Sequence, residues 1–134
     1  MKKLKLIALA LLLIGLADSS YLTLEHFGSV PLVCPVNRII NCFTVLTSRY
    51  SVVFGVPLAV AGLIWAAVML ILLAYSASQV SKTITPIWGF IGAAGVAYSL
   101  IAQYLLGNIC VYCATLDATI ILFLIAVYFG VMRR

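Results

Sequence analysis

Apolar residues dominate four long stretches of the chain, and polar residues gather at the ends of these stretches. The apolar stretches cover residues 6–24, 57–75, 86–106 and 109–131. About 20 mostly apolar residues are needed to cross the ~30 Å of hydrocarbon in a bilayer. The pattern therefore predicts an all-α membrane protein, built as a bundle of four transmembrane helices.

The three connections between these stretches differ in length and composition. Residues 25–56 form one long loop, which holds most of the unusual residues of the chain, whereas residues 76–85 are polar and turn-like. Only Gly107 and Asn108 separate the third stretch from the fourth, so these two predicted helices form a tight antiparallel hairpin. Because the sequence contains no internal repeat and no low-complexity linker, residues 1–134 are expected to form a single domain.

Composition supports the membrane class. The chain is 66% hydrophobic and only 8% charged, with a mean hydropathy of +1.26. A soluble domain of this size needs many more charged groups on its surface. The formal net charge of +5 does not indicate nucleic-acid binding, because the eight Lys and Arg residues lie near the ends of the apolar stretches.

The distribution of positive charge predicts the orientation in the bilayer. With the N-terminus inside, the cytoplasmic segments carry six Lys and Arg residues and the opposite side carries Arg38 and Arg49. This bias predicts cytoplasmic termini and an extracytoplasmic long loop. The basic start and the leucine-rich run that ends near Ala17 also resemble a cleaved signal peptide. Apolar residues continue to Leu24, however, which favours a retained spanning helix.

The four cysteines form two pairs that the predicted topology brings to the same membrane face. Cys34 and Cys42 lie in the long loop, and Cys110 and Cys113 lie at the start of the last apolar stretch. The turn at Gly107-Asn108 supplies an N-cap, so the C-x-x-C pair is expected on one face in the first turns of a helix. A helix N-terminus favours a thiolate, which is the reactive form in thiol–disulfide exchange.

Spacing alone leaves three interpretations of these cysteines open. They are two exchanging pairs, two structural disulfides in a non-catalytic membrane scaffold, or a zinc site of four thiolates. Extracytoplasmic disulfides are compatible with the oxidising conditions there. Zinc is the least favoured, because a closed thiolate cage at the membrane face would leave no evident function, and no metal is expected.

Several motifs resemble those of one known family. Residues 42–51 (CFTVLTSRYS) and 54–59 (FGVPLA) resemble its pattern of a loop cysteine, Val-Leu-x-Ser, an aromatic residue and Gly-x-Pro entering the second helix. Residues 18–23 (DSSYLT) and 109–113 (ICVYC) resemble the end of its first helix and its third-to-fourth helix hairpin. This is the vitamin K epoxide reductase family, and the resemblance is to its bacterial and archaeal members. It extends over nearly the whole chain, with all four cysteines in the expected places.

The resemblance implies a fold, an activity and partners. The family fold is a four-helix bundle around a quinone, and its prokaryotic members oxidise thioredoxin-like proteins. A fused thioredoxin-like domain is not found in the sequence, so the partner is expected to be a separate protein. The implied function is a membrane thiol–disulfide oxidoreductase that passes electrons to a quinone of the menaquinone or ubiquinone type.

Carried over residue by residue, the resemblance also implies a relay of electrons. A partner thiolate attacks Cys34 in a Cys34–Cys42 disulfide, and the released Cys42 then attacks Cys110 in a Cys110–Cys113 disulfide. Cys113 is the sulfur beside the quinone. The long loop is expected to let Cys42 swing over the mouth of the bundle.

The sequence departs from the animal members at the quinone site. Those proteins bind vitamin K through an Asn early in the second helix and a Tyr four residues after the C-x-x-C motif. Here the second position is Asp117, and residues 57–62 contain no Asn. Disulfide formation is therefore favoured over the alternative, a vitamin K epoxide or quinone reductase.

Six residues are candidates for contact with the quinone, five of them described here and the sixth, Asp117, below. Phe43, Leu46 and Tyr50 recur at helical spacing, which predicts a short amphipathic helix that either caps the quinone slot or anchors the loop at the interface. Ser48 is expected to bond the backbone or the quinone. Gln103 bonds either a quinone oxygen or a neighbouring helix.

Two acidic residues within the apolar stretches remain, and such groups attract functional interpretations by default. Asp117 lies at i+4 from Cys113, where it either moves protons to the quinone or bonds a neighbouring helix. For Asp18 a helix-packing hydrogen bond is expected.

Overall fold

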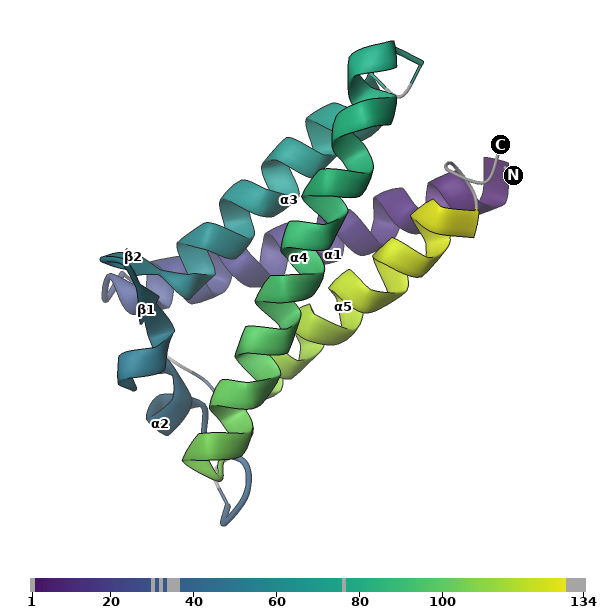
Figure 1. Cartoon of the computed structure of the whole chain (residues 1–134). Helices are drawn as coiled ribbons and strands as arrows, with labels where there is room; N and C mark the ends of the chain where they lie inside the picture. The colour runs from purple at the N-terminus through teal and green to yellow at the C-terminus, as the bar shows by residue number, and fades with distance from the viewer. Residues whose placement is uncertain (1, 30, 32, 34–36, 76, 130–134) are drawn as a thin grey trace.

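The computed structural model describes residues 2–29, 31, 33, 37–75 and 77–129, and the side chains of all of these except Lys2 and Phe43. Its long elements are α1 (Lys2–His26), α3 (Leu58–Ala74), α4 (Gln79–Leu106) and α5 (Val111–Val127). The start of α1, the α3–α4 turn and the end of α5 lie at one end of the bundle (Figure 1). The long connection and the α4–α5 turn lie at the other end.

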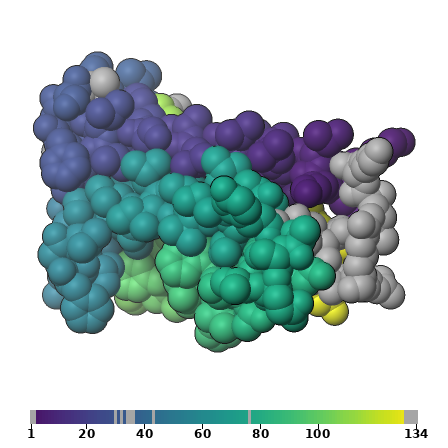
Figure 2. Space-filling view, turned by 90° about the horizontal axis from the view of Figure 1, so that it is seen from above, coloured from purple at the N-terminus to yellow at the C-terminus, as the bar shows by residue number. Residues whose placement is uncertain are grey.

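Each helix packs against two others, so the four form a ring in the order α1, α3, α4, α5. α1 contacts both α3 and α5, and α4 contacts the same two helices. Figure 2 shows α1 and α3 side by side along their lengths. The prediction of an all-α protein is confirmed for the long elements.

Two of the helices, α1 and α4, are long and apolar enough to cross a membrane. The other two, α3 and α5, are apolar helices of 17 residues each. The expected connection at residues 76–85 is wrong over most of its length, because α4 already begins at Gln79 and continues through Pro86. The reason is local: the hydroxyl of Ser78 accepts the N–H of Ser81 at 3.0 Å and caps a new helix.

The core between α3, α4 and α5 is built around two tryptophans. The Trp65 indole N–H donates to the Trp88 carbonyl at 2.8 Å, and the Trp88 indole N–H donates to the Trp65 carbonyl at 3.0 Å. Trp65 also meets Phe123 edge-on, with ring centroids 5.9 Å apart. Because both indoles have partners, these large side chains pack in an apolar interior without an unpaired donor.

The long connection contains short elements rather than one helix. α2 (Cys42–Leu46) ends four residues before Tyr50, which lies in the 3₁₀ helix η1 (Arg49–Ser51). The predicted amphipathic helix is therefore correct only for its first part. The strands β1 (Val52–Val53) and β2 (Val56–Pro57) follow as a small antiparallel hairpin.

The turn of this hairpin explains why the chain leaves the helical conformation. Its two central residues, Phe54 and Gly55, have φ angles of 53° and 79°. Positive φ at both central residues matches the twist of two-residue hairpins, and the β-branched valines on either side favour strands. The hairpin thus directs the chain from the loop into α3.

Substitution of Gly92 tests the packing of α3 on α4. A Cβ atom at Gly92 would lie 2.5 Å from Cζ2 of Trp65, whereas one at Gly95 would meet nothing within 4 Å. We expect Gly92→Ala to lower the free energy of unfolding by about 1–3 kcal/mol, because the hydrogen-bonded indole cannot move freely. Gly95→Ala should change it by less than about 1 kcal/mol. Thermal unfolding in detergent compares the two, and equal stabilities would contradict this packing.

Candidate functional site

Backbone pairing joins the long loop to the α4–α5 turn. The Ile109 N–H donates to the Ile39 carbonyl at 2.6 Å, and the Asn41 N–H donates to the Ile109 carbonyl at 3.0 Å. Ile40 and Ile109 thereby form an isolated parallel bridge. Since Cys42 follows Asn41 and Cys110 follows Ile109, this bridge brings one cysteine of each pair together.

The sulfurs at this junction are buried. Cys42 and Cys110 are both 0% exposed, and together with Val45 they form one apolar cluster against which Cys113 packs. Cys42 is disulfide-bonded, while Cys110 and Cys113 are free thiols. Cys34, the predicted partner of Cys42, lies outside the described residues. In this structure Cys42 lies beside Cys110 in the same buried cluster.

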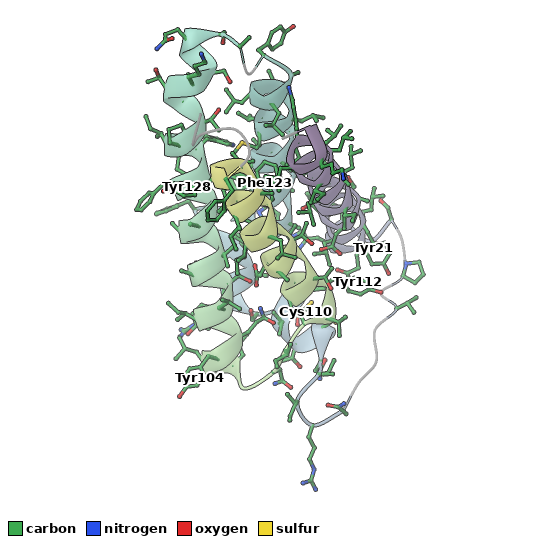
Figure 3. The ribbon with its side chains drawn as sticks, turned by 90° about the vertical axis from the view of Figure 1, so that its right-hand side faces the viewer. Tyr21, Tyr104, Cys110, Tyr112, Phe123 and Tyr128 are labelled. Atoms are coloured by element: carbon green, nitrogen blue, oxygen red, sulfur yellow. The ribbon has the colours of Figure 1, made fainter. Side chains whose placement is uncertain are left out.

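Cys110 is itself the N-cap of α5. Its backbone is extended, with φ −90° and ψ 120°, and its Sγ accepts the N–H of Cys113 at 3.3 Å. The expectation of an N-cap at the Gly107-Asn108 turn is wrong, because Gly107 closes α4 with φ 71° and Asn108 donates to the Leu106 carbonyl. Residues 108–110 stay extended, which allows Ile109 to pair with the loop. Figure 3 shows Cys110 at the start of α5.

A cavity of about 180 Å³ lies behind the junction and is mostly apolar. α1, α2, η1, α3, α4 and α5 all contribute to its wall. The wall contains the sulfur-bearing residue Cys113 and, one turn further along α5, Asp117. Gly62 of α3 and Gly92 and Gly95 of α4 also line the cavity, and they contribute no side chains to its wall.

The candidate quinone contacts fall into different places. Leu46, Ser48 and Tyr50 line the cavity. The Ser48 hydroxyl donates to the Val45 carbonyl at 2.7 Å, so it bonds the backbone as one of its two predicted roles required. The side chain of Phe43 lies outside the described part of the chain.

Gln103 does not line the cavity, and its amide links the C-x-x-C motif to Asp117. The Gln103 Oε1 accepts the N–H of Cys110 at 2.9 Å. Its Nε2 donates to Asp117 Oδ2 at 3.3 Å, and the Ser99 hydroxyl donates to the same oxygen at 2.8 Å. All three side chains are at least 93% buried. The network therefore holds the Asp117 carboxyl on the cavity wall and fixes the backbone at Cys110.

Two polar groups of α1 lie close by without hydrogen bonds. Asp18 Oδ2 and Ser19 Oγ are buried and have no partner among the described residues, so the hydrogen bond predicted for Asp18 is not formed by this oxygen. Buried polar atoms without partners are rare and call for an explanation, such as a bound group or water.

The family model described as the vitamin K epoxide reductase family matches residues 6–128. The chain belongs to the vitamin K epoxide reductase family. This confirms the resemblance carried by the cysteine and Gly-x-Pro motifs. A comparison with curated proteins found no match.

Membership of the vitamin K epoxide reductase family defines the general chemistry. The chain is a membrane oxidoreductase of the class that is linked to thiols and quinones. The cavity of about 180 Å³ has room for an aromatic ring, because an apolar cavity of ~150 Å³ accepts benzene. Within the described residues, no group of three or more His, Cys, Asp and Glu side chains is placed to hold a metal ion.

Sequence reasoning missed Ser99 and Trp65. Ser99 lies four residues before Gln103 in an apolar helix, so the two polar side chains share one face. That spacing could have indicated from the sequence that the two side chains act together. Trp65 lines the cavity through its packing against Gly92, which lies on another helix. No pattern within a single helix could have paired them.

Substitution of Gln103 tests the buried network. Gln103→Leu removes the acceptor of the Cys110 N–H and one donor to Asp117, so we expect the free energy of unfolding to fall by about 1–3 kcal/mol. Cys110 is fully buried in the unsubstituted chain, and in this variant it should react faster with an alkylating reagent in the folded protein. The control is Gln79→Leu at the exposed start of the same helix. Equal stability and equal alkylation of the two variants would argue against the network.

Proposed function

We propose that the chain reoxidises a thioredoxin-like protein on the extracytoplasmic side and passes the electrons to a membrane quinone. The observation that carries this proposal is the continuity of the buried site. Cys42 packs with Cys110, and Cys113 packs against the same cluster while lining the cavity. A path from one cysteine pair to the other, and on to an apolar cavity, is what such a relay requires.

The proposal includes four membrane spans. Helices of 17 residues are about 26 Å long, which is near the lower limit for crossing the hydrocarbon core. Each of the four helices also exposes large apolar side chains, among them Leu13, Ile71, Phe90 and Leu122, at 51%, 58%, 76% and 54%. Lipid is the solvent that suits such a surface. The excess of positive charge at the opposite end supports an extracytoplasmic loop.

The relay moves two electrons by successive thiol–disulfide exchanges. A partner thiolate attacks Cys34, and a Cys34–partner disulfide forms as Cys42 leaves with the electron pair of the broken bond. The second partner thiolate then resolves this mixed disulfide, which leaves an oxidised partner and two loop thiols. When the C-x-x-C pair is in its oxidised form, Cys42 attacks Cys110, the Cys110–Cys113 bond breaks and Cys113 leaves as a thiolate. Cys34 then attacks Cys42, which restores the loop disulfide and leaves the C-x-x-C pair as the dithiol found in this structure.

The residues of the cavity wall are suited to hold a quinone and to supply protons. A bound quinone accepts the two electrons of the C-x-x-C dithiol together with two protons. Leu46, Tyr50 and Gly62 lie on the wall of this mostly apolar cavity, where a quinone ring would find apolar contacts. Asp117 lies on the same wall as Cys113, and we assign to its carboxyl the transfer of a proton at Oδ1, because Oδ2 accepts hydrogen bonds from Ser99 and Gln103 that orient the group.

Quinone reduction by the purified protein tests the function. With a dithiol donor and a short-tailed ubiquinone, we expect turnover by the unsubstituted chain and background rates for Cys113→Ser, because the sulfur on the cavity wall is lost. Val111→Ala, between the two cysteines and partly exposed, should keep its activity. A scaffold with structural disulfides would reduce no quinone in any of these forms, and that result would reject the proposal.

A substitution of Cys42 tests which sulfur meets the partner. In Cys42→Ser the free Cys34 thiolate attacks a thioredoxin variant that keeps only its first cysteine, activated as a disulfide with a small thiol, and that small thiol leaves. The mixed disulfide accumulates because neither Cys42 nor a second thioredoxin cysteine is there to resolve it. Non-reducing electrophoresis should show the adduct. The double variant Cys34→Ser, Cys42→Ser should show none. An adduct that persists in the double variant would move the point of attack to the C-x-x-C pair.

A further inference from the structure

A tyrosine of α1 packs against a tyrosine within the C-x-x-C motif, and neither has a part in the relay. Tyr21 lies near the end of α1, and Tyr112 directly precedes Cys113. Their ring centroids are 5.1 Å apart (Figure 3). The pair therefore stands between the first helix and the reactive segment of the last one.

The hydroxyl groups of both tyrosines bond the backbone of the loop just before Cys34. The Tyr21 hydroxyl donates to the Pro31 carbonyl at 2.8 Å and accepts the Val33 N–H at 3.1 Å. The Tyr112 hydroxyl donates to the Val33 carbonyl. Both polar groups of the Val33 backbone are thus taken by side-chain hydroxyls.

Apolar burial contributes little to holding this part of the loop. The Val33 side chain is 68% exposed, so the three hydrogen bonds are its main attachment. Further along the loop, two residues before Cys42, the bridge of Ile40 with Ile109 provides a second attachment. The Ile40 bridge ends on Ile109, just before Cys110, and the Tyr112 bond starts just before Cys113, whereas the two Tyr21 bonds hold the loop to α1. The segment from Val33 to Ile40 is consequently held at both ends.

We propose that Tyr21 and Tyr112 form a clamp that orients the partner-facing cysteine. Cys34 follows Val33 directly, and consecutive Cα atoms are about 3.8 Å apart, so fixing the Val33 backbone restricts where Cys34 can stand. Thiol–disulfide exchange depends on which sulfur is accessible, and reactions between large partners depend strongly on orientation. Both tyrosines are positioning residues for the proposed function, on which this inference rests.

The choice of electron donor distinguishes the clamp from a merely structural role. A protein dithiol must dock in one orientation, whereas a small dithiol adapts to any. With reduced thioredoxin we expect kcat/KM to fall about fivefold in Tyr21→Phe and in Tyr112→Phe, since each loses hydroxyl bonds but keeps its ring. With dithiothreitol the rates should stay within about twofold. Tyr128→Phe, about 24 Å further along the same helix, is the control and should match the unsubstituted chain with both donors.

The two substitutions should also fail to add. Because both hydroxyls hold the same residue, the double variant should lose little more than the worse single variant. Losses that multiply, or losses of equal size with both donors, would reduce the tyrosines to general contributors to folding and overturn the clamp.

Amide hydrogen exchange tests the clamp without any turnover. In the folded protein the Val33 N–H should exchange about tenfold faster in Tyr21→Phe, because its acceptor is removed. In Tyr128→Phe its exchange should be unchanged. Unaltered exchange in Tyr21→Phe would overturn the clamp even if the relay works. Faster exchange in a chain that reduces no quinone would retain the clamp and reject the proposed function instead.

Discussion

The structure depends on one short stretch of backbone pairing, between Ile40 of the long loop and Ile109 of the α4–α5 turn. The loop is otherwise remote in sequence from the last two helices. Among the described residues, its main-chain hydrogen bonds are the ones that hold the segment before Cys42 against the segment before Cys110. The pairing is possible only because residues 108–110 remain extended after α4 ends at Gly107. Cys42 and Cys110 are therefore brought together by ordinary main-chain hydrogen bonds.

The apolar cavity and the polar network behind it are complementary parts of one arrangement. The cavity is mostly apolar, and the polar side chains in its wall include His26, Ser48, Ser99 and Asp117. Buried carboxyl groups are costly unless hydrogen bonds satisfy them. Ser99 and Gln103 supply those bonds from the neighbouring helix. An acidic side chain can thus face an apolar slot in a fixed orientation.

Much of this could be predicted from the sequence, because lipid imposes simple rules on composition and length. The positions of the four long helices and the family followed from apolar runs and from cysteine motifs. The prediction was wrong where local capping competed with polarity: Ser78 starts α4 in a polar segment, and Cys110 replaces the turn residues as the cap of α5. The hairpin at Phe54-Gly55 ended the amphipathic helix early. The Gln103 network and the tyrosine pair join residues from different helices, and no single-helix pattern reveals such contacts.

The spacer of the C-x-x-C motif has an unexpected constraint. Ile109 pairs with Ile40 of the loop and Tyr112 bonds Val33, so the spacing from Ile109 to Tyr112 also sets the register of the loop on α5. Each added residue turns a helix by about 100°. A residue inserted between Cys110 and Tyr112 would therefore carry Tyr112 around the helix and away from Val33, even if the two sulfurs could still meet. In this protein the spacing within the motif constrains the position of the loop as well as that of the thiols.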